Sequence, residues 1–122
     1  MFQDEVRLLT FFGPGGTGKT RLALQVAGDI IEKFEDGIFF VFLGAIVDAK
    51  LVASAIAASL IVRESGERPL SEGLREHLAK KNLLLVLDNF EHVIAAKTLI
   101  LDLLVDCSRL KVLVTSREMP WW

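Results

Sequence analysis

Apolar residues recur along the chain in two alternating patterns. Short continuous apolar runs suit buried strands, and longer stretches with helical spacing suit amphipathic helices. The strand-like runs are 6–12, 38–43, 83–87 and 112–115, and the helical stretches are 19–34, 48–62, 70–81 and 91–108. The resulting order β-α-β-α-α-β-α-β predicts an α/β fold in which helices cover both faces of a parallel sheet.

Individual patterns refine this prediction. The unbroken apolar run 38–43 predicts a strand that is covered on both faces. Stretch 91–108 predicts one helix with a polar stripe through Ala95, Thr98, Asp102 and Asp106. Gly28 costs helix 19–34 about 1 kcal/mol relative to alanine, which suggests close packing on the sheet at that position.

Composition narrows the class of protein. The 122 residues suffice for one domain, and 52% hydrophobic with 25% charged residues indicates a globular chain. With 14 basic and 16 acidic residues, the net charge of -2 argues against direct nucleic-acid contact by this segment. The apolar stretch 38–62 carries Asp48 and Lys50, each costing about 2.5–3.5 kcal/mol at a bilayer centre, so no membrane contact is expected.

Cys107 is the single cysteine and lies in an apolar pattern, so it is interpreted as a small buried hydrophobic residue. Its acidic neighbours Asp102 and Asp106 would not activate a thiol. The lone thiol and the lack of a signal peptide favour a cytoplasmic location.

The segment 13–20, Gly-Pro-Gly-Gly-Thr-Gly-Lys-Thr, fits the P-loop pattern between a strand and a helix. Its glycines let backbone N–H groups approach phosphate oxygens, and the helix adds its positive end. Lys19 is expected to reach the β- and γ-phosphates, and the Thr20 hydroxyl to bind Mg²⁺. The alternative is a glycine-rich turn that binds nothing.

Asp88 follows the buried strand 83–87, at the edge where open α/β sheets bind ligands. It is predicted to hold Mg²⁺ directly or through water, although an aspartate in an ordinary turn would give the same pattern. Glu91 is the nearest carboxylate that could orient a water, and a charge that opens the next helix explains it equally well.

Three segments together resemble the STAND class of signal-transduction ATPases. They are Gly-Pro-Gly-Gly-Thr-Gly-Lys-Thr-Arg-Leu-Ala-Leu, Leu-Leu-Leu-Val-Leu-Asp-Asn-Phe-Glu-His and Val-Leu-Val-Thr-Ser-Arg-Glu. The nearest resemblance is to the NB-ARC-like predicted-ATPase module of large bacterial transcriptional regulators. It implies ATP or ADP with Mg²⁺ as cofactors and a sheet of order 2-3-4-1.

The resemblance also implies roles for individual residues. Nucleotide binding falls on Gly13, Gly15, Gly16, Thr17, Gly18, Lys19, Thr20 and Arg21, and metal binding on Thr20 and Asp88. Lys19, Asp88, Glu91 and Arg117 are the catalytic candidates. Arg117 is expected to face the γ-phosphate, where a guanidinium stabilises phosphoryl charge, unless it is simply a solvent-exposed arginine.

The chain departs from the family pattern in two respects. Asn89 follows Asp88 where fast ATPases of the AAA type carry a glutamate. The chain also ends before the family's fifth strand and winged-helix lid, so residues 1–122 are expected to be a fragment or shortened form of a single P-loop domain. The strand 6–12 would then lie at a sheet edge and favour self-association.

These features favour a nucleotide-dependent switch with slow ATP hydrolysis, in a signal-transduction or transcriptional regulator. A stand-alone NTPase and a non-catalytic, self-associating remnant with weak nucleotide binding are the alternatives. A small-molecule kinase is disfavoured because no arginine-rich lid segment follows the last motif.

Overall fold

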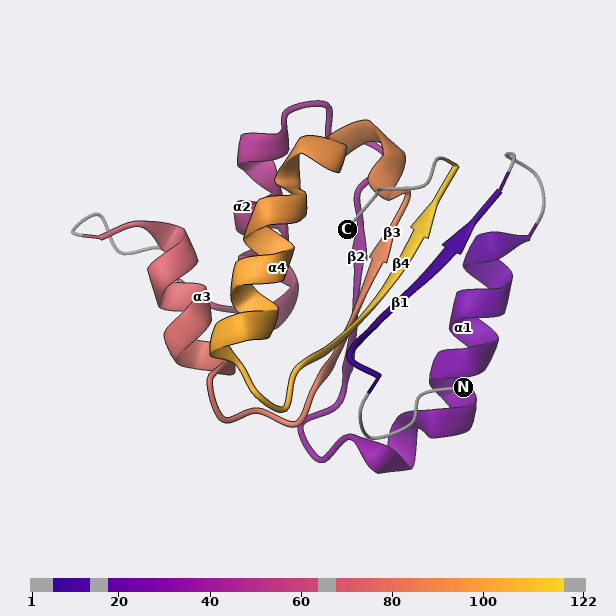
Figure 1. The fold of residues 1–122 in the computed structure, drawn as a ribbon, viewed down its shortest axis with the longest axis horizontal. Helices are drawn as coiled ribbons and strands as arrows, with labels where there is room; N and C mark the ends of the chain where they lie inside the picture. The colour runs from indigo at the N-terminus through magenta and orange to yellow at the C-terminus, as the bar shows by residue number, and fades with distance from the viewer. Residues whose placement is uncertain (1–5, 14–17, 64–67, 118–122) are drawn as a thin grey trace.

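The computed structural model describes residues 6–13, 18–63 and 68–117. Its strands are β1 (Leu8–Phe12), β2 (Ile38–Phe42), β3 (Leu84–Asp88) and β4 (Lys111–Ser116). Its α-helices are α1 (Lys19–Ile30), α2 (Val52–Leu60), α3 (Leu70–Leu78) and α4 (Lys97–Asp106), and its 3₁₀ helices are η1 (Ile31–Lys33), η2 (Ala49–Leu51) and η3 (Phe90–Ala96). Helix α1 lies on one face of the sheet and α2, α3 and α4 lie on the other (Figure 1). The predicted α/β class is confirmed.

The sheet is parallel throughout, in the order β1-β4-β3-β2. This is the predicted order 2-3-4-1 read from the opposite edge. Phe12 is in register with Ser116, and Phe42 with Asp88. The carboxyl ends of the four strands therefore meet at one edge of the sheet, beside the start of α1 (Figure 1).

Alternate residues of the strands supply two separate apolar clusters. Leu85, Leu87, Val112 and Val114 pack toward α2, α3 and α4. Leu84, Val86 and Leu113 pack toward α1, against Ala23, Val26 and Ile30. The central strands β3 and β4 are consequently covered on both faces, as the run 83–87 predicted.

The prediction that the run 38–43 is covered on both faces holds for most of the run, because Val41, Leu43 and Phe39 pack in one cluster and Ile38 and Phe40 pack against the other. Strand β2 lies at the sheet edge, where Val41 is buried but Phe42 is 61% exposed and stacks on Phe40. Gly28 also lacks its expected contact with the sheet, because a Cβ atom there would meet nothing within 4 Å. No helix in the described ranges is both long enough and apolar enough to cross a membrane.

The predicted single helix 91–108 is divided. Residues Phe90–Ala96 form the 3₁₀ helix η3, which is interrupted at Val93 (φ −136°, ψ 33°), and α4 begins only at Lys97. Phe90, Val93 and Ala96 are all buried, a spacing of three that matches 3₁₀ rather than α-helical geometry. The predicted polar stripe is exposed, with Ala95 in η3 and Thr98, Asp102 and Asp106 in α4.

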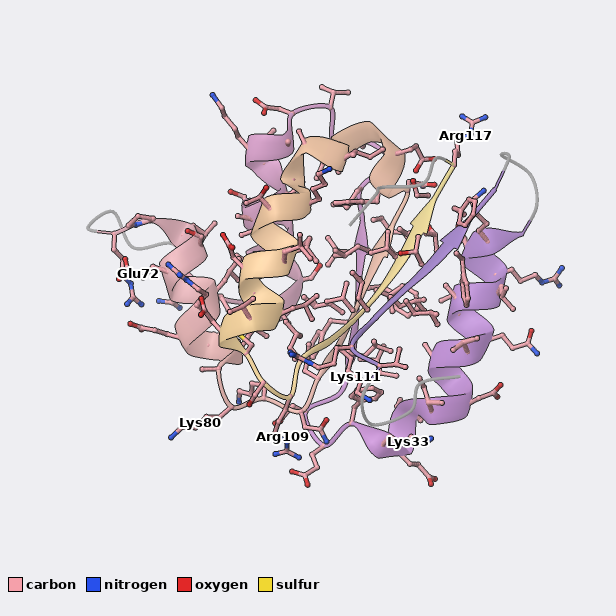
Figure 2. All side chains as sticks on the ribbon, in the orientation of Figure 1. Lys33, Glu72, Lys80, Arg109, Lys111 and Arg117 are labelled. Atoms are coloured by element: carbon pink, nitrogen blue, oxygen red, sulfur yellow. The ribbon has the colours of Figure 1, made fainter. Side chains whose placement is uncertain are left out.

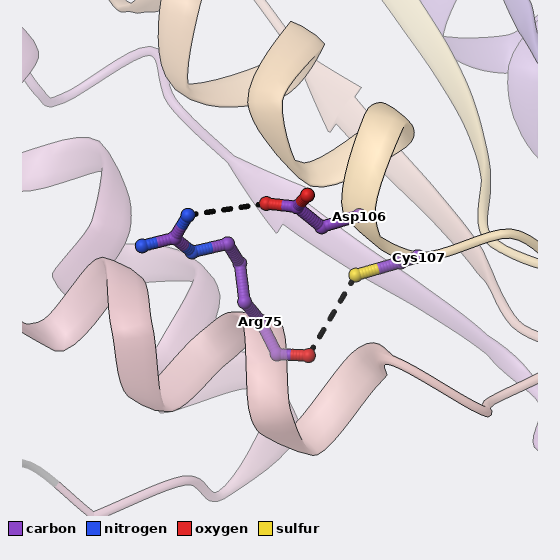
Figure 3. A network of polar contacts seen from close by, with 3 residues as sticks. All are labelled: Arg75, Asp106 and Cys107. Carbon is purple, nitrogen blue, oxygen red and sulfur yellow. Dashed lines mark hydrogen bonds and ion pairs between the residues drawn. The ribbon is translucent and has the colours of Figure 1, made fainter.

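Cys107 follows α4 as its C-cap residue and is fully buried, which confirms its predicted packing role. Its Sγ donates to the carbonyl oxygen of Arg75 on α3 at 3.7 Å, while the Arg75 guanidinium donates to Asp106 Oδ2 at 3.1 Å (Figure 3). Burial raises the pKa of the Cys107 thiol, and the charge of Asp106 adds to that effect. The thiol is therefore held in its unreactive neutral form.

Candidate nucleotide-binding site

The candidate site lies at the carboxyl edge of the sheet, where the P-loop segment leaves β1 and enters α1. The Gly13 N–H donates to the Ser116 carbonyl at 3.1 Å, so the start of the loop is attached to the end of β4. Gly15, Gly16 and Thr17, which the motif assigns to phosphate contact, lie outside the described residues. Gly18, Lys19, Thr20 and Arg21 are described at the start of α1.

Gly18 caps the amino end of α1 in the left-handed conformation (φ 78°, ψ 24°), which favours glycine over residues with a Cβ atom. Among the described residues no side chain caps this helix end, and its first intrahelical bond runs from Leu22 N–H to the Gly18 carbonyl at 2.9 Å. The positive end of the helix dipole therefore points at the loop without a carboxylate to offset it.

Lys19 reaches back to Gly13, the residue that ends the described part of the chain before the loop. Its Nζ donates to the Gly13 carbonyl oxygen at 2.9 Å, so the ammonium group lies across the base of the P-loop. A phosphate oxygen would be a stronger acceptor for this donor than a neutral carbonyl, because donor and acceptor would then carry opposite charges. Arg21, by contrast, is exposed on the first turn of α1.

Thr20 and Asp88 are brought together, as the sequence predicted. The Thr20 hydroxyl lies 2.9 Å from Asp88 Oδ1 and 3.1 Å from Oδ2, so its proton is shared by the carboxylate. Asp88 is 2% exposed, at the last position of β3. Since a hydroxyl has one proton and two lone pairs, donation to Asp88 leaves the lone pairs of Thr20 available to a cation.

Thr115 completes this network, and the sequence alone did not assign it a role at the metal site. Its hydroxyl donates to Asp88 Oδ1 at 2.6 Å and accepts the Asn89 N–H at 3.0 Å. Thr115 is 1% exposed, one residue before the end of β4. Strand order alone places Thr115 near Asp88, because the carboxyl ends of neighbouring parallel strands converge, but the hydrogen bond itself depends on side-chain distances.

Asn89 adopts the left-handed conformation (φ 64°, ψ 48°), which asparagine tolerates better than most residues. A Cβ atom on Gly44 would lie 3.0 Å from Asn89 Nδ2, so the loop after β2 must approach this side chain closely. Gly44 thus lies directly against the Asn89 side chain.

The remaining two catalytic candidates occupy different environments. Glu91 lies in the first turn of η3, and its buried Oε2 has no hydrogen-bond partner within the part of the chain that the structure describes. Arg117 follows β4 at the same edge of the sheet and is exposed, with its guanidinium projecting beyond the strand (Figure 2). Glu91 is thus buried in the first turn of η3, and Arg117 is open to solvent at the edge of the sheet.

The donor set fits Mg²⁺. Among the described residues, no three His, Cys, Asp or Glu side chains gather to form an all-protein metal cage. A hydroxyl and one carboxylate at 2.9 Å are hard oxygen ligands. Mg²⁺ is characteristically held by one or two carboxylates together with substrate phosphates and water.

Comparison with known proteins identifies the family. The NB-ARC domain model matches residues 1–120, so the chain belongs to the NB-ARC family and is a P-loop nucleotide-binding module. A Mycobacterium tuberculosis protein named "Putative HTH-type transcriptional regulator Rv0890c" is 39% identical over 113 residues, which cover 92% of this chain and 13% of that protein. A second protein of that organism, "Uncharacterized protein Rv0894", is 35% identical over 116 residues, which cover 94% of this chain and 30% of its own length. The chain therefore spans less than a third of either relative.

Solved structures confirm the fold. CDC6P from Pyrobaculum aerophilum matches with a TM-score of 0.69 and 18% identity, over 91% of this chain and 32% of that one. The ORC2 protein of Aeropyrum pernix, solved as ADPNP and ADP complexes, matches with a TM-score of 0.67 and 16% identity, over 94% of this chain and 36% of that one. At this identity the likeness concerns the fold alone.

Proposed function

We propose that this chain binds ATP with Mg²⁺ and acts as a nucleotide-dependent switch with slow hydrolysis, as one module of a transcriptional regulator. The observation that carries the proposal is the 2.9 Å contact between the Thr20 hydroxyl and the Asp88 carboxylate. It joins the first turn of α1 to the end of β3, where a P-loop protein holds its metal.

The phosphates would lie at the amino end of α1. The uncapped helix end attracts anionic oxygens, and Lys19 would exchange the Gly13 carbonyl for a phosphate oxygen. Thr20 and Asp88 would hold Mg²⁺, and the bound ion would neutralise charge that develops on the phosphates. Thr115 would keep Asp88 in place through its 2.6 Å hydrogen bond.

Slow rather than fast turnover follows from the residues around Asp88. Asn89 cannot act as a general base, because its amide does not titrate and its Nδ2 is directed at Asp88 Oδ2 at 3.5 Å. Glu91 supplies a buried carboxylate oxygen without a protein partner in the described chain, which would accept a hydrogen bond from an attacking water. Arg117 would bind the γ-phosphate, which distinguishes ATP from ADP.

The similar proteins support the proposed role in a transcriptional regulator and the proposed nucleotide ligand. A mycobacterial relative is named as a transcriptional regulator, and a structural neighbour was solved with ADPNP and ADP. A switch requires the two nucleotide states to differ in their contacts with the protein. In this chain Arg117 is the candidate for that difference, because it is exposed at the edge where the γ-phosphate would lie.

Calorimetry of ATP and ADP binding, paired with a phosphate-release assay, tests the proposal. We expect the parent chain to bind ATP in the presence of Mg²⁺ and to release phosphate slowly. Lys19→Ala should lose most triphosphate affinity, whereas Lys50→Ala, which removes an exposed lysine near α2, should not. Equal ATP affinity in the parent and Lys19→Ala would contradict the phosphate site, and binding without phosphate release would contradict hydrolysis.

The metal assignment has its own test. Asp88→Ala should weaken the Mg²⁺ dependence of ATP binding more than it weakens binding in the absence of Mg²⁺, because Asp88 is assigned to the metal and not to the phosphates. Overlapping Mg²⁺ titrations for the variant and the parent would refute this role. A melting curve without nucleotide separates this result from loss of the fold.

A further inference from the structure

A cavity lies at the opposite end of the sheet from the P-loop. It has a volume of about 280 Å³, and four of its lining residues are basic: Arg7, Lys33, Arg109 and Lys111. Asn82 and Ser108 add polar groups, and none of the lining residues that the structure describes is acidic. We propose that this cavity binds a compact multivalent oxyanion of the condensed-phosphate class, independently of the nucleotide site.

The topology explains why cations from distant parts of the sequence converge here. Arg7 directly precedes β1, Arg109 lies in the turn before β4, and Lys111 is the first residue of β4. Lys33 ends η1, on the path from α1 to β2. The amino ends of parallel strands share one edge, so these side chains meet at the end of the molecule where Figure 2 shows Lys33, Arg109 and Lys111.

Neutral groups hold the guanidinium of Arg7 in place. Its Nε and Nη2 donate to the Leu110 carbonyl at 3.2 and 3.0 Å, and Nη2 also donates to the Cys107 carbonyl. Carbonyl oxygens orient the guanidinium without neutralising it, as a carboxylate would. Arg7 therefore contributes a fixed positive charge to the cavity wall, while its Nη1 has no partner among the described residues.

Among the described residues, the acidic side chains at this end lie outside the cavity lining. Glu35 approaches Arg109 only at 4.0 Å, and both side chains are more than half exposed, so the pair is weak. The Asp36 carboxylate accepts the Asn82 backbone N–H at 2.7 Å and is thereby committed to the turn before β3. In a chain whose net charge is -2, four cations around one hollow form a local positive field.

Shape and surroundings favour a compact ligand over a polymer. The volume of about 280 Å³ is near the lower limit of small-molecule sites, which begin at roughly 300 Å³. Glu32 and Glu35 are exposed on either side of Lys33, and they would repel an acidic peptide or a nucleic-acid backbone that extended beyond the cavity. A di- or triphosphate presents several negative charges within the cavity itself.

Calorimetric titration with inorganic diphosphate tests the proposal. Every protein in the test carries Lys19→Ala, so that a loss of affinity cannot be attributed to the P-loop. Lys33→Ala with Arg109→Ala removes two cavity cations that are exposed and make no strong contact with the protein. Lys50→Ala with Lys80→Ala removes the same charge outside the cavity, and Lys80 lies at the same end of the molecule (Figure 2).

We expect the cavity double variant to bind diphosphate at least about tenfold more weakly, because two charge-assisted contacts are lost, and the control double variant to stay within about twofold. Unchanged melting temperatures confirm that both variants fold. Equal losses in the two double variants, or no measurable diphosphate binding to the Lys19→Ala protein, would overturn the proposal. Binding of a polyglutamate peptide or an oligonucleotide that depends on the cavity, with none for diphosphate, would overturn the choice of a compact ligand.

Discussion

The Thr115 hydroxyl donates to Oδ1 of Asp88 across 2.6 Å, and through this bond β4 fixes the carboxylate at the end of β3. The same hydroxyl accepts the Asn89 N–H at 3.0 Å, so one side chain satisfies groups on two consecutive residues. Both Thr115 and Asp88 are buried, which makes any unpaired polar group among them costly. The candidate metal ligand is thus oriented by a neighbouring strand.

Replacing Thr115 with valine tests this arrangement. Thr115→Val keeps the shape of the side chain but leaves the Asn89 N–H without its acceptor and Asp88 without one donor. We expect a loss of roughly 1–3 kcal/mol in the free energy of unfolding, together with a weaker Mg²⁺ dependence of ATP binding. Denaturant unfolding and Mg²⁺ titration measure the two effects.

Thr98→Val on the exposed face of α4 is the matched control, since it makes the same chemical change away from Asp88. It should leave Mg²⁺ dependence unchanged. A Thr115→Val protein that unfolds like the parent and responds identically to Mg²⁺ would show that Thr115 does not position Asp88.

Arg117→Ala should lower the affinity for ATP, or its turnover, while leaving the affinity for ADP nearly unchanged. This follows because an exposed guanidinium at the carboxyl end of β4 would meet the γ-phosphate, which ADP lacks. Calorimetry with both nucleotides measures the difference, and Arg63→Ala, another exposed arginine, serves as the control. An equal loss of affinity for ATP and ADP would indicate a structural role, and unchanged ATP affinity and turnover would show that Arg117 does not contact the γ-phosphate.

Most of the fold could be predicted from the sequence because the parallel sheet leaves a strong apolar signal. The run 83–87 is buried on both faces and is followed by Asp88 at the carboxyl edge, as expected. The run 38–43 is equally apolar, yet Phe42 is 61% exposed, because an apolar run does not show which of its residues the helices cover. The helical periodicity also missed the 3₁₀ segment at Phe90–Ala96, where apolar residues spaced by three are buried.

The site was predictable to the extent that its residues belong to short motifs. Thr20 and Asp88 are 68 positions apart, and the P-loop pattern with the strand order was enough to place them together. The role of Thr115 and the close approach of Gly44 to Asn89 depend on side-chain distances between separate segments. The basic cavity likewise arises from residues before different strands, which carry no local motif.

Cys107 gives a pH-dependent prediction with a definite sign. Burial, with a contribution from Asp106, raises the pKa of the folded thiol above its ordinary value of 9.0. The unfolded chain therefore loses its thiol proton first, so the stability contribution is complete below the unfolded pKa and is lost as pH rises through the folded pKa. Between about pH 8 and about pH 10, the parent should lose more stability than Cys107→Ala.

Denaturant unfolding of both proteins at each pH isolates the thiol, because all other titrating groups are common to the pair. Alkylation of the folded parent should also be slow at neutral pH and accelerate when denaturant is added. Parallel stability curves for the parent and Cys107→Ala, or fast alkylation without denaturant, would contradict a buried neutral thiol.

The last prediction concerns self-association through β1. In the described part of the chain β1 pairs with β4 on one side only, and Phe12 at its end is 55% exposed. An edge strand with apolar side chains favours pairing with another chain, and a lysine on such an edge opposes it. We therefore expect self-association in light scattering at about 50 µM, reduced by Phe12→Lys. Phe42→Lys is the matched control, because Phe42 is 61% exposed at the corresponding end of the other edge strand, β2.

ATP with Mg²⁺ should raise the melting temperature, since a ligand at 100 times its Kd adds about 2.7 kcal/mol to the stability of the folded state. A monomer with no nucleotide-dependent shift in melting would refute both parts, and equal effects of the two lysine variants would show that β1 is not the preferred edge.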